Sequence, residues 1–341
     1  MSLKLSIVDQ VPVHEGHTQA EALHLATRLA KKADELGFHR YWFAEHHATP
    51  CYACASPEIM IGHIAANTQR IRVGSGGVML SHYSPYKIAE QFRTLSALFP
   101  DRIDLGVGRA PGGSGLPTLA LNYPYAGAPN DDFLSRLGWL TEFMESSEID
   151  ARPYSGLTTT PQGNVSFEKW QLGSSDGSIE LAARFGWGFV LALFIGNHER
   201  PAEIVQRYRQ QFKKYQGENA EPHALIATAT ICADSKEEAE HIAATHTFWK
   251  LQSQMRGVRE GLRAPEECLD LLKDASPSEL AFFNETRNNM VTGTPEECRD
   301  QIEKLAMHYG VDEVVSVSVT HDYSVREKSY EKLAKVFDLA G

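Results

Sequence analysis

The sequence predicts an α/β protein folded as one closed (β/α)8 barrel, the TIM-barrel fold, with residues 1–341 forming a single domain. Two observations predict it. Eight short runs of apolar and β-branched residues alternate with longer segments whose apolar residues recur at helical spacing. No polar linker, repeat or low-complexity stretch interrupts the alternation, which favours the closed barrel over a doubly wound open sheet with a second domain.

The apolar runs give the expected strands, which are residues 3–8, 41–44, 71–80, 103–107, 169–172, 188–192, 224–232 and 314–319. The helical patterns between them are residues 20–36, 57–67, 87–99, 132–144, 178–185, 201–215, a helix from residue 236 onward, 295–309 and 325–337. Several of these helices carry end signals. Thr294 stands before Pro295 with Glu297 three residues on, and Gly37 and Gly310 follow the last apolar residue of their helices.

Two connections are too long for a plain barrel and predict insertions after the fourth and seventh strands. Residues 110–131 and 145–168 flank the fourth helix, and residues 250–293 separate the seventh strand's helix from the eighth unit. Long insertions in barrels often become lids, and we expect residues 250–293 to cover the site.

Composition restricts the classes of partner. Hydrophobic residues make up 42% of the chain and charged residues 23%, as in ordinary globular proteins, while the net charge of -11 argues against nucleic acid and anionic membranes. No apolar stretch approaches about 18 residues, and the first residues lack the pattern of a signal peptide. We therefore expect a cytoplasmic protein that acts on a small molecule.

The five cysteines are scattered and odd in number, which indicates free thiols rather than a disulfide framework. Cys51 and Cys54 have Cys-x-x-Cys spacing. Because no second such pair accompanies them, ordinary packing is favoured over zinc or redox duty.

Reactive groups in such a barrel lie just after the carboxyl ends of the strands, and those positions hold unusual residues here. After the fifth strand, a loop with Ser174, Ser175 and Ser178 enters a helix, so hydroxyls and free backbone N–H groups are available to a phosphate. The alternative is that Ser175 or Asp176 merely caps the helix.

Arg109, in the sequence GVGRAPGG that starts at Gly106, is the natural cation for that anion. This sequence superficially resembles a dinucleotide-binding glycine loop, but Pro111 stands where the third glycine is needed. Gly106 and Gly108 are instead expected to let the backbone approach a ligand, or to form a structural turn.

Glu45, His46 and His47 follow the second strand. Alternation should point one histidine into the pocket and the other away, and we expect Glu45 to fix the tautomer of His46. The alternative is a histidine that serves only the structure.

In their order, these segments resemble the luciferase-like monooxygenases: Tyr41-Trp42-Phe43-Ala44-Glu45-His46-His47, then Arg72 to Pro85, then Arg102 to Arg109, then Gly173-Ser174-Ser175, and finally residues 293–322. The resemblance spans nearly the whole chain and implies a single luciferase-like barrel domain. It also implies a flavoprotein that uses reduced FMN and O2 to oxidise a small organic substrate, such as an aldehyde of the alkanal type.

The family resemblance also implies roles for particular residues. The FMN phosphate is expected at the serine loop and Arg109, and the flavin ring against a non-prolyl cis peptide that maps to Gly76–Gly77, followed by Val78. His46 takes the place of the catalytic histidine, with Glu45 beside it. Gly108 stands where some luciferases carry a reactive cysteine, which puts light emission in doubt.

Several alternatives stay open. A deazaflavin- or FMN-dependent oxidoreductase that transfers hydride without oxygen fits the same barrel. A metal-dependent hydrolase using His46, His47 and His82 is disfavoured by the spacing of its ligands, and a flavin-binding protein without catalysis is disfavoured by Glu45 and His46. Candidate partners are a separate flavin reductase, because the chain lacks a Rossmann signature, and a second copy in a homodimer.

Overall fold

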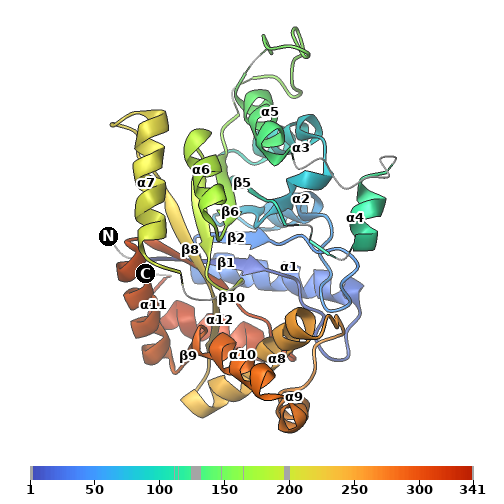
Figure 1. Ribbon diagram of the computed structural model, residues 1–341, viewed down its shortest axis with the longest axis vertical. Coiled ribbons are helices and arrows are strands. Elements are labelled where there is room, and N and C mark those ends of the chain that lie inside the picture. Colours follow the sequence, from blue (N-terminus) through green and yellow to red (C-terminus); the bar gives the residue numbers. More distant parts are fainter. Residues whose placement is uncertain are drawn as a thin grey trace.

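The computed structural model describes residues 3–110, 112–113, 115–123, 132–146, 148–163, 165–195 and 200–339. Eight parallel strands close into a barrel in the order β10-β1-β2-β3-β5-β6-β7-β8, and β10 pairs with β8 to complete the ring. These strands are β1 (Lys4–Asp9), β2 (Arg40–Phe43), β3 (Arg72–Ser75), β5 (Ile103–Gly108), β6 (Glu168–Gly173), β7 (Gly188–Ala192), β8 (Ala224–Cys232) and β10 (Glu313–Val317). The closed barrel is thus confirmed and the open sheet is wrong (Figure 1).

Helices follow the strands and surround the barrel. They are α1 (Gln19–Leu36), α2 (Pro57–Asn67), α3 (Pro85–Leu98), α5 (Phe133–Glu145), α6 (Asp176–Arg184), α7 (Glu203–Gln216), α8 (Lys236–Met255), α11 (Pro295–Tyr309) and α12 (Tyr323–Val336). The expected end signals are confirmed: Thr294 and Glu297 form a capping box, and Gly37 and Gly310 end their helices in left-handed conformation. Among the described residues, no helix is long and apolar enough to cross a membrane.

The third strand was predicted as one continuous run, residues 71–80, and the structure differs. It divides into β3 and β4 (Val78–Met79), with a cis peptide between Gly76 and Gly77 at the division. The divided strand still reaches its neighbour, because β4 pairs with β5. The sequence also missed β9 (Val291–Gly293), whose three residues pair with the end of β8 beyond the barrel.

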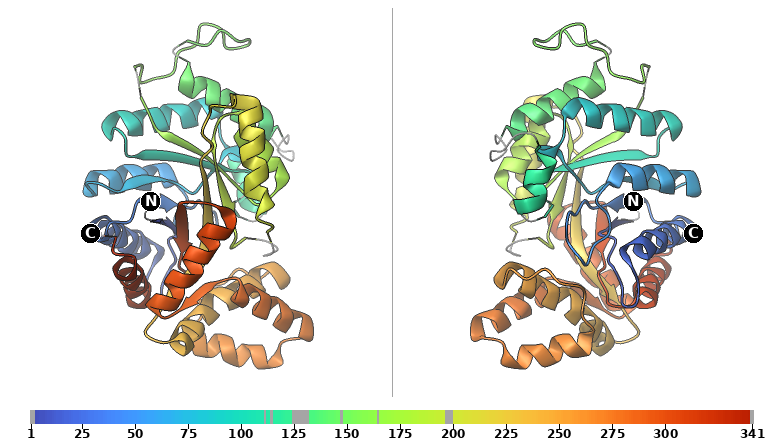
Figure 2. Two further views of the ribbon diagram at one scale, coloured as in Figure 1. Left: turned by 90° about the vertical axis from the view of Figure 1, so that its left-hand side faces the viewer. Right: turned by 90° about the vertical axis from the view of Figure 1, so that its right-hand side faces the viewer.

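Both predicted insertions are present. The first contains α4 (Gly115–Leu121) and α5, and Pro111 lies outside the described residues. The second is largely helical, because α8 is followed by α9 (Pro265–Leu271), a short 3-10 turn and α10 (Pro277–Asn288). Figure 2 shows α8–α10 grouped at one end of the molecule, opposite the segment that follows α5.

The barrel interior is filled at its amino-terminal end, which leaves the opposite end for a site. Trp42 and Trp170 pack inside the barrel with ring centroids 5.8 Å apart. Beneath them Arg40 pairs with Asp104, Glu168 and Glu313, and the indole N–H of Trp42 donates to Asp104 at 2.8 Å. Charges buried in this way need such pairing, so this end is structural.

Candidate active site at the carboxyl end of the barrel

Glu45 lies just past β2 and is 1% exposed. Its Oε1 accepts hydrogen bonds from His47 Nε2 and from the Tyr83 hydroxyl, both at 2.6 Å, and its Oε2 accepts from the backbone N–H of Met79 at 2.8 Å. His47 lies on the same segment as Glu45, whereas Met79 and Tyr83 lie in and just after the segment β4–Leu80–His82. The carboxylate therefore joins the end of β2 to β4 and to the 3-10 turn Leu80–His82 that precedes Tyr83.

The expected pairing of Glu45 with His46 is wrong. In an extended chain, side chains two residues apart share a side, and Glu45 therefore meets His47 while His46 points elsewhere. The ring of His46 packs on Tyr52 with centroids 4.5 Å apart. Its Nδ1 is buried and has no hydrogen-bond partner among the described residues.

Burial lowers the pKa of His46 from 6.5 to about 4, although a hydrogen bond with the backbone of Ala44 opposes the shift. His46 is therefore neutral at neutral pH and has a ring nitrogen able to accept a proton.

The second insertion reaches this site through α8. Trp249 packs edge-on against Tyr52, with centroids 5.1 Å apart, so the rings of His46, Tyr52 and Trp249 form a continuous aromatic cluster. Next to it, Lys250 is buried and donates to the backbone oxygen of Phe194, just past β7. Burial lowers the pKa of Lys250 to about 8.

Sequence reasoning missed Tyr52, Tyr83, Trp249 and Lys250. Tyr83 was within reach of prediction, because it comes four residues after β4 in a run of polar strand-exit residues. Tyr52 lies between Cys51 and Cys54, which are both free and buried, and burial raises the pKa of Cys51 to about 12. No sequence signal marked the α8 residues, since only the path of the chain brings them here.

The cis peptide between Gly76 and Gly77 lies where the family resemblance placed it. A side chain at Gly77 is excluded, because a Cβ atom there would lie 2.8 Å from the backbone oxygen of Gly106. Val78 is buried beside them in β4. Gly76 and Gly77 present bare backbone between the β2 and β5 exits.

The serine loop follows β6, and Ser174, Ser175 and Ser178 lie close together in it. Ser175 occupies the N-cap position of α6, but its hydroxyl makes no capping hydrogen bond and lies 3.4 Å from that of Ser178. Ser175 is thus the N-cap residue, as the alternative interpretation had it, but its hydroxyl does not cap the helix. Asp176, in the first turn, is paired with Arg207 at 2.9 Å, which offsets its negative charge.

Arg109 lies one residue past β5 and is exposed. Because Val107 pairs with Gln171 in the β5–β6 register, the same register places the backbone of Arg109 level with Gly173, where the serine loop begins. No ion pair to Arg109 occurs within the described part of the chain. The cation and the three hydroxyls thus belong to neighbouring strand exits.

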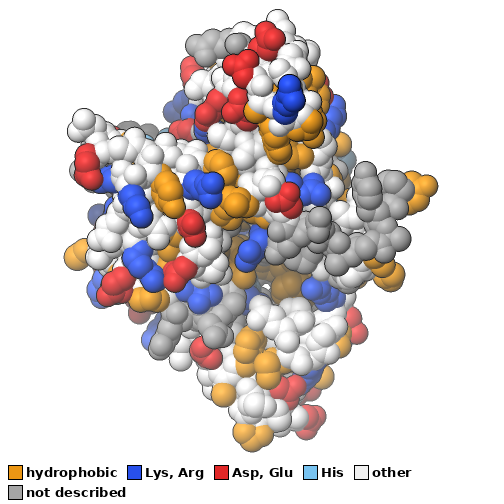
Figure 3. Space-filling view, turned by 45° about the horizontal axis from the view of Figure 1, so that its top comes forward, with side chains coloured by type: hydrophobic (Ala, Val, Ile, Leu, Met, Phe, Trp, Pro, Cys, Tyr) orange, Lys and Arg blue, Asp and Glu red, His pale blue; other side chains and the backbone are white. Residues whose placement is uncertain are grey.

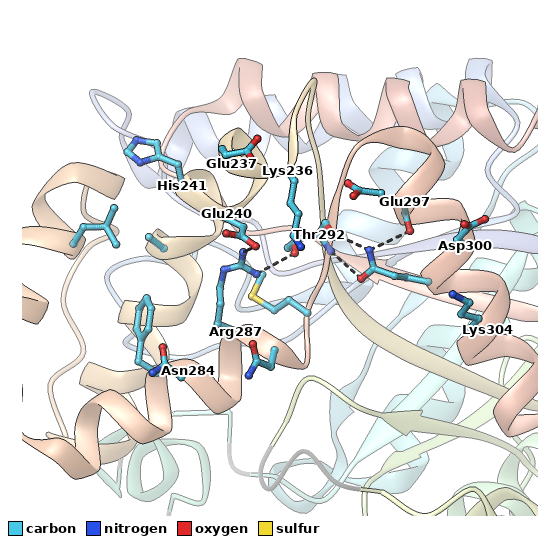
Figure 4. Close-up of a pocket in the computed structure, with 16 residues that line it drawn as sticks. Lys236, Glu237, Glu240, His241, Asn284, Arg287, Thr292, Glu297, Asp300 and Lys304 are labelled. Atoms are coloured by element: carbon cyan, nitrogen blue, oxygen red, sulfur yellow. Dashed lines mark hydrogen bonds and ion pairs between the residues drawn. The ribbon is translucent and has the colours of Figure 1, made fainter.

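Figure 3 shows a hollow on the face that carries these strand ends, with Lys and Arg side chains beside it. In the described ranges, no group of three or more His, Cys, Asp or Glu residues is arranged to hold a metal ion. A separate groove of about 850 Å³ lies between α8, α10, β9 and α11 (Figure 4). None of the predicted site residues lines that groove, where Arg287 instead pairs with Glu240 at 3.3 Å.

Comparison with known proteins gives consistent results. The family model for luciferase-like monooxygenases matches residues 3–313. N-acetyl-S-alkylcysteine monooxygenase of Bacillus subtilis (strain 168) is 37% identical over 333 residues, which cover 97% of each chain. The crystal structure of apo-MsnO8 superposes with a TM-score of 0.86 at 38% identity, covering 99% of each chain.

More distant solved structures share the fold and carry two kinds of cofactor. The oxygenating constituent of 3,6-diketocamphane monooxygenase from Pseudomonas putida, in complex with FMN, gives a TM-score of 0.70 at 17% identity, covering 98% of this chain and 97% of that one. An F420-dependent secondary alcohol dehydrogenase gives 0.71 at 13% identity, covering both chains fully.

Proposed function

Because the chain belongs to the luciferase-like monooxygenase family, we propose that it is a flavin-dependent monooxygenase that uses reduced FMN and O2 to oxidise a small organic substrate. One observation carries the proposal: the neutral His46 and the polar loop of Ser174, Ser175 and Ser178 lie at strand exits on the same face of the barrel.

The described residues fit FMN. Ser174, Ser175 and Ser178, with Arg109, would hold the phosphate, because the Ser175 hydroxyl is not used in capping and the positive end of the α6 dipole lies beside it. Gly76, Gly77 and Val78 would support the flavin ring. Gly108 leaves room above β5, since among the described residues a Cβ atom there would meet only the Met79 sulfur, at 4.0 Å.

When bound, reduced flavin supplies the two electrons with which O2 is activated. The protein's own residues manage protons and water. His46 would accept a proton during oxygen transfer, because burial keeps its ring neutral. Tyr52 and Trp249 would exclude water from the reacting atoms, and Glu45 would hold the segments around them in place.

The substrate is proposed as an aldehyde of the alkanal type. The relative that acts on N-acetyl-S-alkylcysteine adds thioethers as a second class to be tested. Reduced flavin would come from a separate reductase.

A hydride-transferring oxidoreductase with FMN or a deazaflavin is the alternative, favoured by the shared fold of the F420-dependent dehydrogenase. Titration of the purified protein with FMN and with F420, followed by absorption and fluorescence, separates the two cofactors. Mixing the reduced FMN complex with O2 and either octanal or an S-alkyl thioether then tests oxygenation. Tight FMN binding with an oxygenated product supports the proposal; binding of F420 alone would refute it.

A further inference from the structure

We propose that His47 is the proton donor of this site and that Glu45 and Tyr83 position it. The inference rests on the proposed function and assigns a role that the expected residues, His46 and Glu45, do not cover.

The Glu45 carboxylate cannot be stable here without compensation, because burying a lone charge is costly. Both of its oxygens are occupied by donors, and His47 is its ion-pairing partner within the described part of the chain. Neither lysine nor arginine supplies the countercharge in that part. Protonated His47 is therefore the countercharge of the Glu45 carboxylate in this proposal.

The geometry fixes which ring nitrogen of His47 is free. Its Nε2 faces the carboxylate at 2.6 Å and the Tyr83 hydroxyl at 3.4 Å, so Nε2 carries a proton towards Glu45. In the donor form of the ring Nδ1 carries a second proton, which is the one available for transfer. The His47 side chain is 12% exposed, which leaves a route for proton exchange. His46, with no carboxylate partner, lacks this arrangement.

The backbone of His47 is held as firmly as its ring. Its N–H donates to the backbone oxygen of Gly112 at 2.8 Å. The loop after β5 packs so closely that a Cβ atom on Gly113 would lie 2.7 Å from the His47 oxygen. Tyr83 is anchored in turn, because Arg136 donates to its backbone oxygen at 2.7 Å. Such fixed geometry suits a group whose proton must arrive at one point.

Glu45 also connects this pair to the proposed flavin support. It accepts from Met79 N–H, two residues after Gly77, and Met79 pairs with Gly108 of β5. Loss of the Glu45 carboxylate would disturb both features together. Loss of the Tyr83 hydroxyl would remove one donor from Glu45 Oε1 and its contact with His47, but would leave the Met79 hydrogen bond in place, which makes Tyr83 the sharper probe.

The proposed step is a proton transfer alone. The Nδ1–H bond of the doubly protonated His47 ring breaks, an O–H bond forms on the oxygen atom that leaves as water, and Nδ1 of the now neutral imidazole regains a proton from solvent. The titratable groups that face His47 are Glu45 and His46 on its own segment, His82 and Tyr83 from the turn after β4, and Glu58 from α2.

The first test needs no cofactor. Long-range 1H–15N spectra of the histidine-labelled protein between pH 5 and 9 report the tautomer and titration of His47. In the wild type we expect Nε2 to stay protonated across this range and Nδ1 to be the nitrogen that gains and loses a proton. In Tyr83→Phe we expect an altered tautomer ratio or titration midpoint. Tyr86→Phe is the matched control, since the Tyr86 hydroxyl donates to Thr158 outside this network. Identical His47 signals in the wild type and Tyr83→Phe would overturn the positioning role.

The second test follows single-turnover oxidation of octanal and of an S-alkyl thioether by the protein loaded with photoreduced FMN. His47→Gln retains a donor for Glu45 but no ring proton, and should slow product formation by about 10²–10⁴-fold. Tyr83→Phe should slow it by about five- to tenfold and shift the pH profile, and Tyr86→Phe should leave both unchanged.

A wild-type rate and pH profile in His47→Gln would overturn this inference and leave the proposed function standing. Failure of the wild type to bind FMN would instead overturn the proposed function, and with it the role of His47 in that reaction.

Discussion

Trp249, in the helix that starts the second insertion, packs edge-on against Tyr52, and Tyr52 in turn packs on His46. The contact joins an element from late in the chain to the β2 exit. The ring centroids of His46 and Tyr52 are 4.5 Å apart, and those of Tyr52 and Trp249 are 5.1 Å apart. Helix α8 is therefore part of the wall of the site.

Trp249→Ala should therefore open the wall to water. In the reduced, FMN-loaded protein we expect more O2 to be released as hydrogen peroxide and less to be incorporated into product, because water exclusion protects the reacting atoms. The measurement is the ratio of peroxide to oxygenated product. Trp139→Ala is the matched control, since Trp139 on α5 is half-buried against Phe143 and against Tyr154 from the segment after α5, and its loss should alter stability alone. An equal change of the ratio in both variants would mean that the effect comes from a general loss of protein stability and not from the wall of the site.

Much of the fold was predictable from the sequence, because apolar periodicity and end signals act locally. The expected helix at residues 57–67 and the expected strands at 188–192 and 224–232 coincide with α2, β7 and β8. The three-residue β9 was missed, since so short a strand has no period of its own and depends on its pairing with β8.

The site was predictable only in part. Strand exits indicated Glu45, His46, Arg109 and the serines, because barrel topology gathers those positions at one end. Side chains two residues apart in an extended chain share a side, so Glu45 meets His47. The prediction used this alternation to separate His46 from His47, but did not apply it to Glu45. Tyr52 and Trp249 reach His46 through tertiary packing between distant segments, which no local pattern records.

Arg109→Ala should weaken binding of FMN far more than binding of riboflavin, which lacks the phosphate. A charge-assisted contact of this kind contributes about 1.5–3 kcal/mol, so about a tenfold to hundredfold loss of FMN affinity is expected. Paired fluorescence-quenching titrations measure it. Arg152→Ala serves as control, because Arg152 is also exposed but lies in the segment after α5. Equal losses for the two ligands would remove the phosphate assignment.

Residues 250–293 should become more resistant to protease when FMN and substrate bind. The expectation follows from α8, whose Trp249 and Lys250 contact the barrel mouth while α9 and α10 extend away from it. Limited proteolysis with mapped cleavage sites, with and without ligands, is the measurement. An unchanged cleavage pattern in α9 and α10 would argue against a lid that responds to ligand.

The low pKa of His46 should make stability depend on pH in a defined window. Its pKa is lowered from 6.5 to about 4 in the folded chain, so the unfolded chain binds the proton more readily. The stability linked to neutral His46 is fully present above about pH 6.5 and is lost as pH falls towards about 4. Denaturant unfolding of the wild type and His46→Asn at pH 7 and pH 4.5 measures it. The wild type should lose more stability than the variant between those pH values, and parallel losses would contradict the buried, neutral ring.

His46→Ala should lower the rate of substrate oxidation by about 10²–10⁴-fold if the ring accepts a proton in the reaction. FMN affinity should change little, because the proposed phosphate contacts lie at the exits of β5 and β6. The rate, the FMN affinity and the melting temperature must be measured together, since the same ring packs on Tyr52. His46→Gln preserves more of that packing than alanine while removing the imidazole, and should be as slow as His46→Ala. A wild-type rate in either variant would exclude the catalytic role. A joint fall of rate, affinity and melting temperature in both variants would instead assign His46 to the structure of the aromatic cluster.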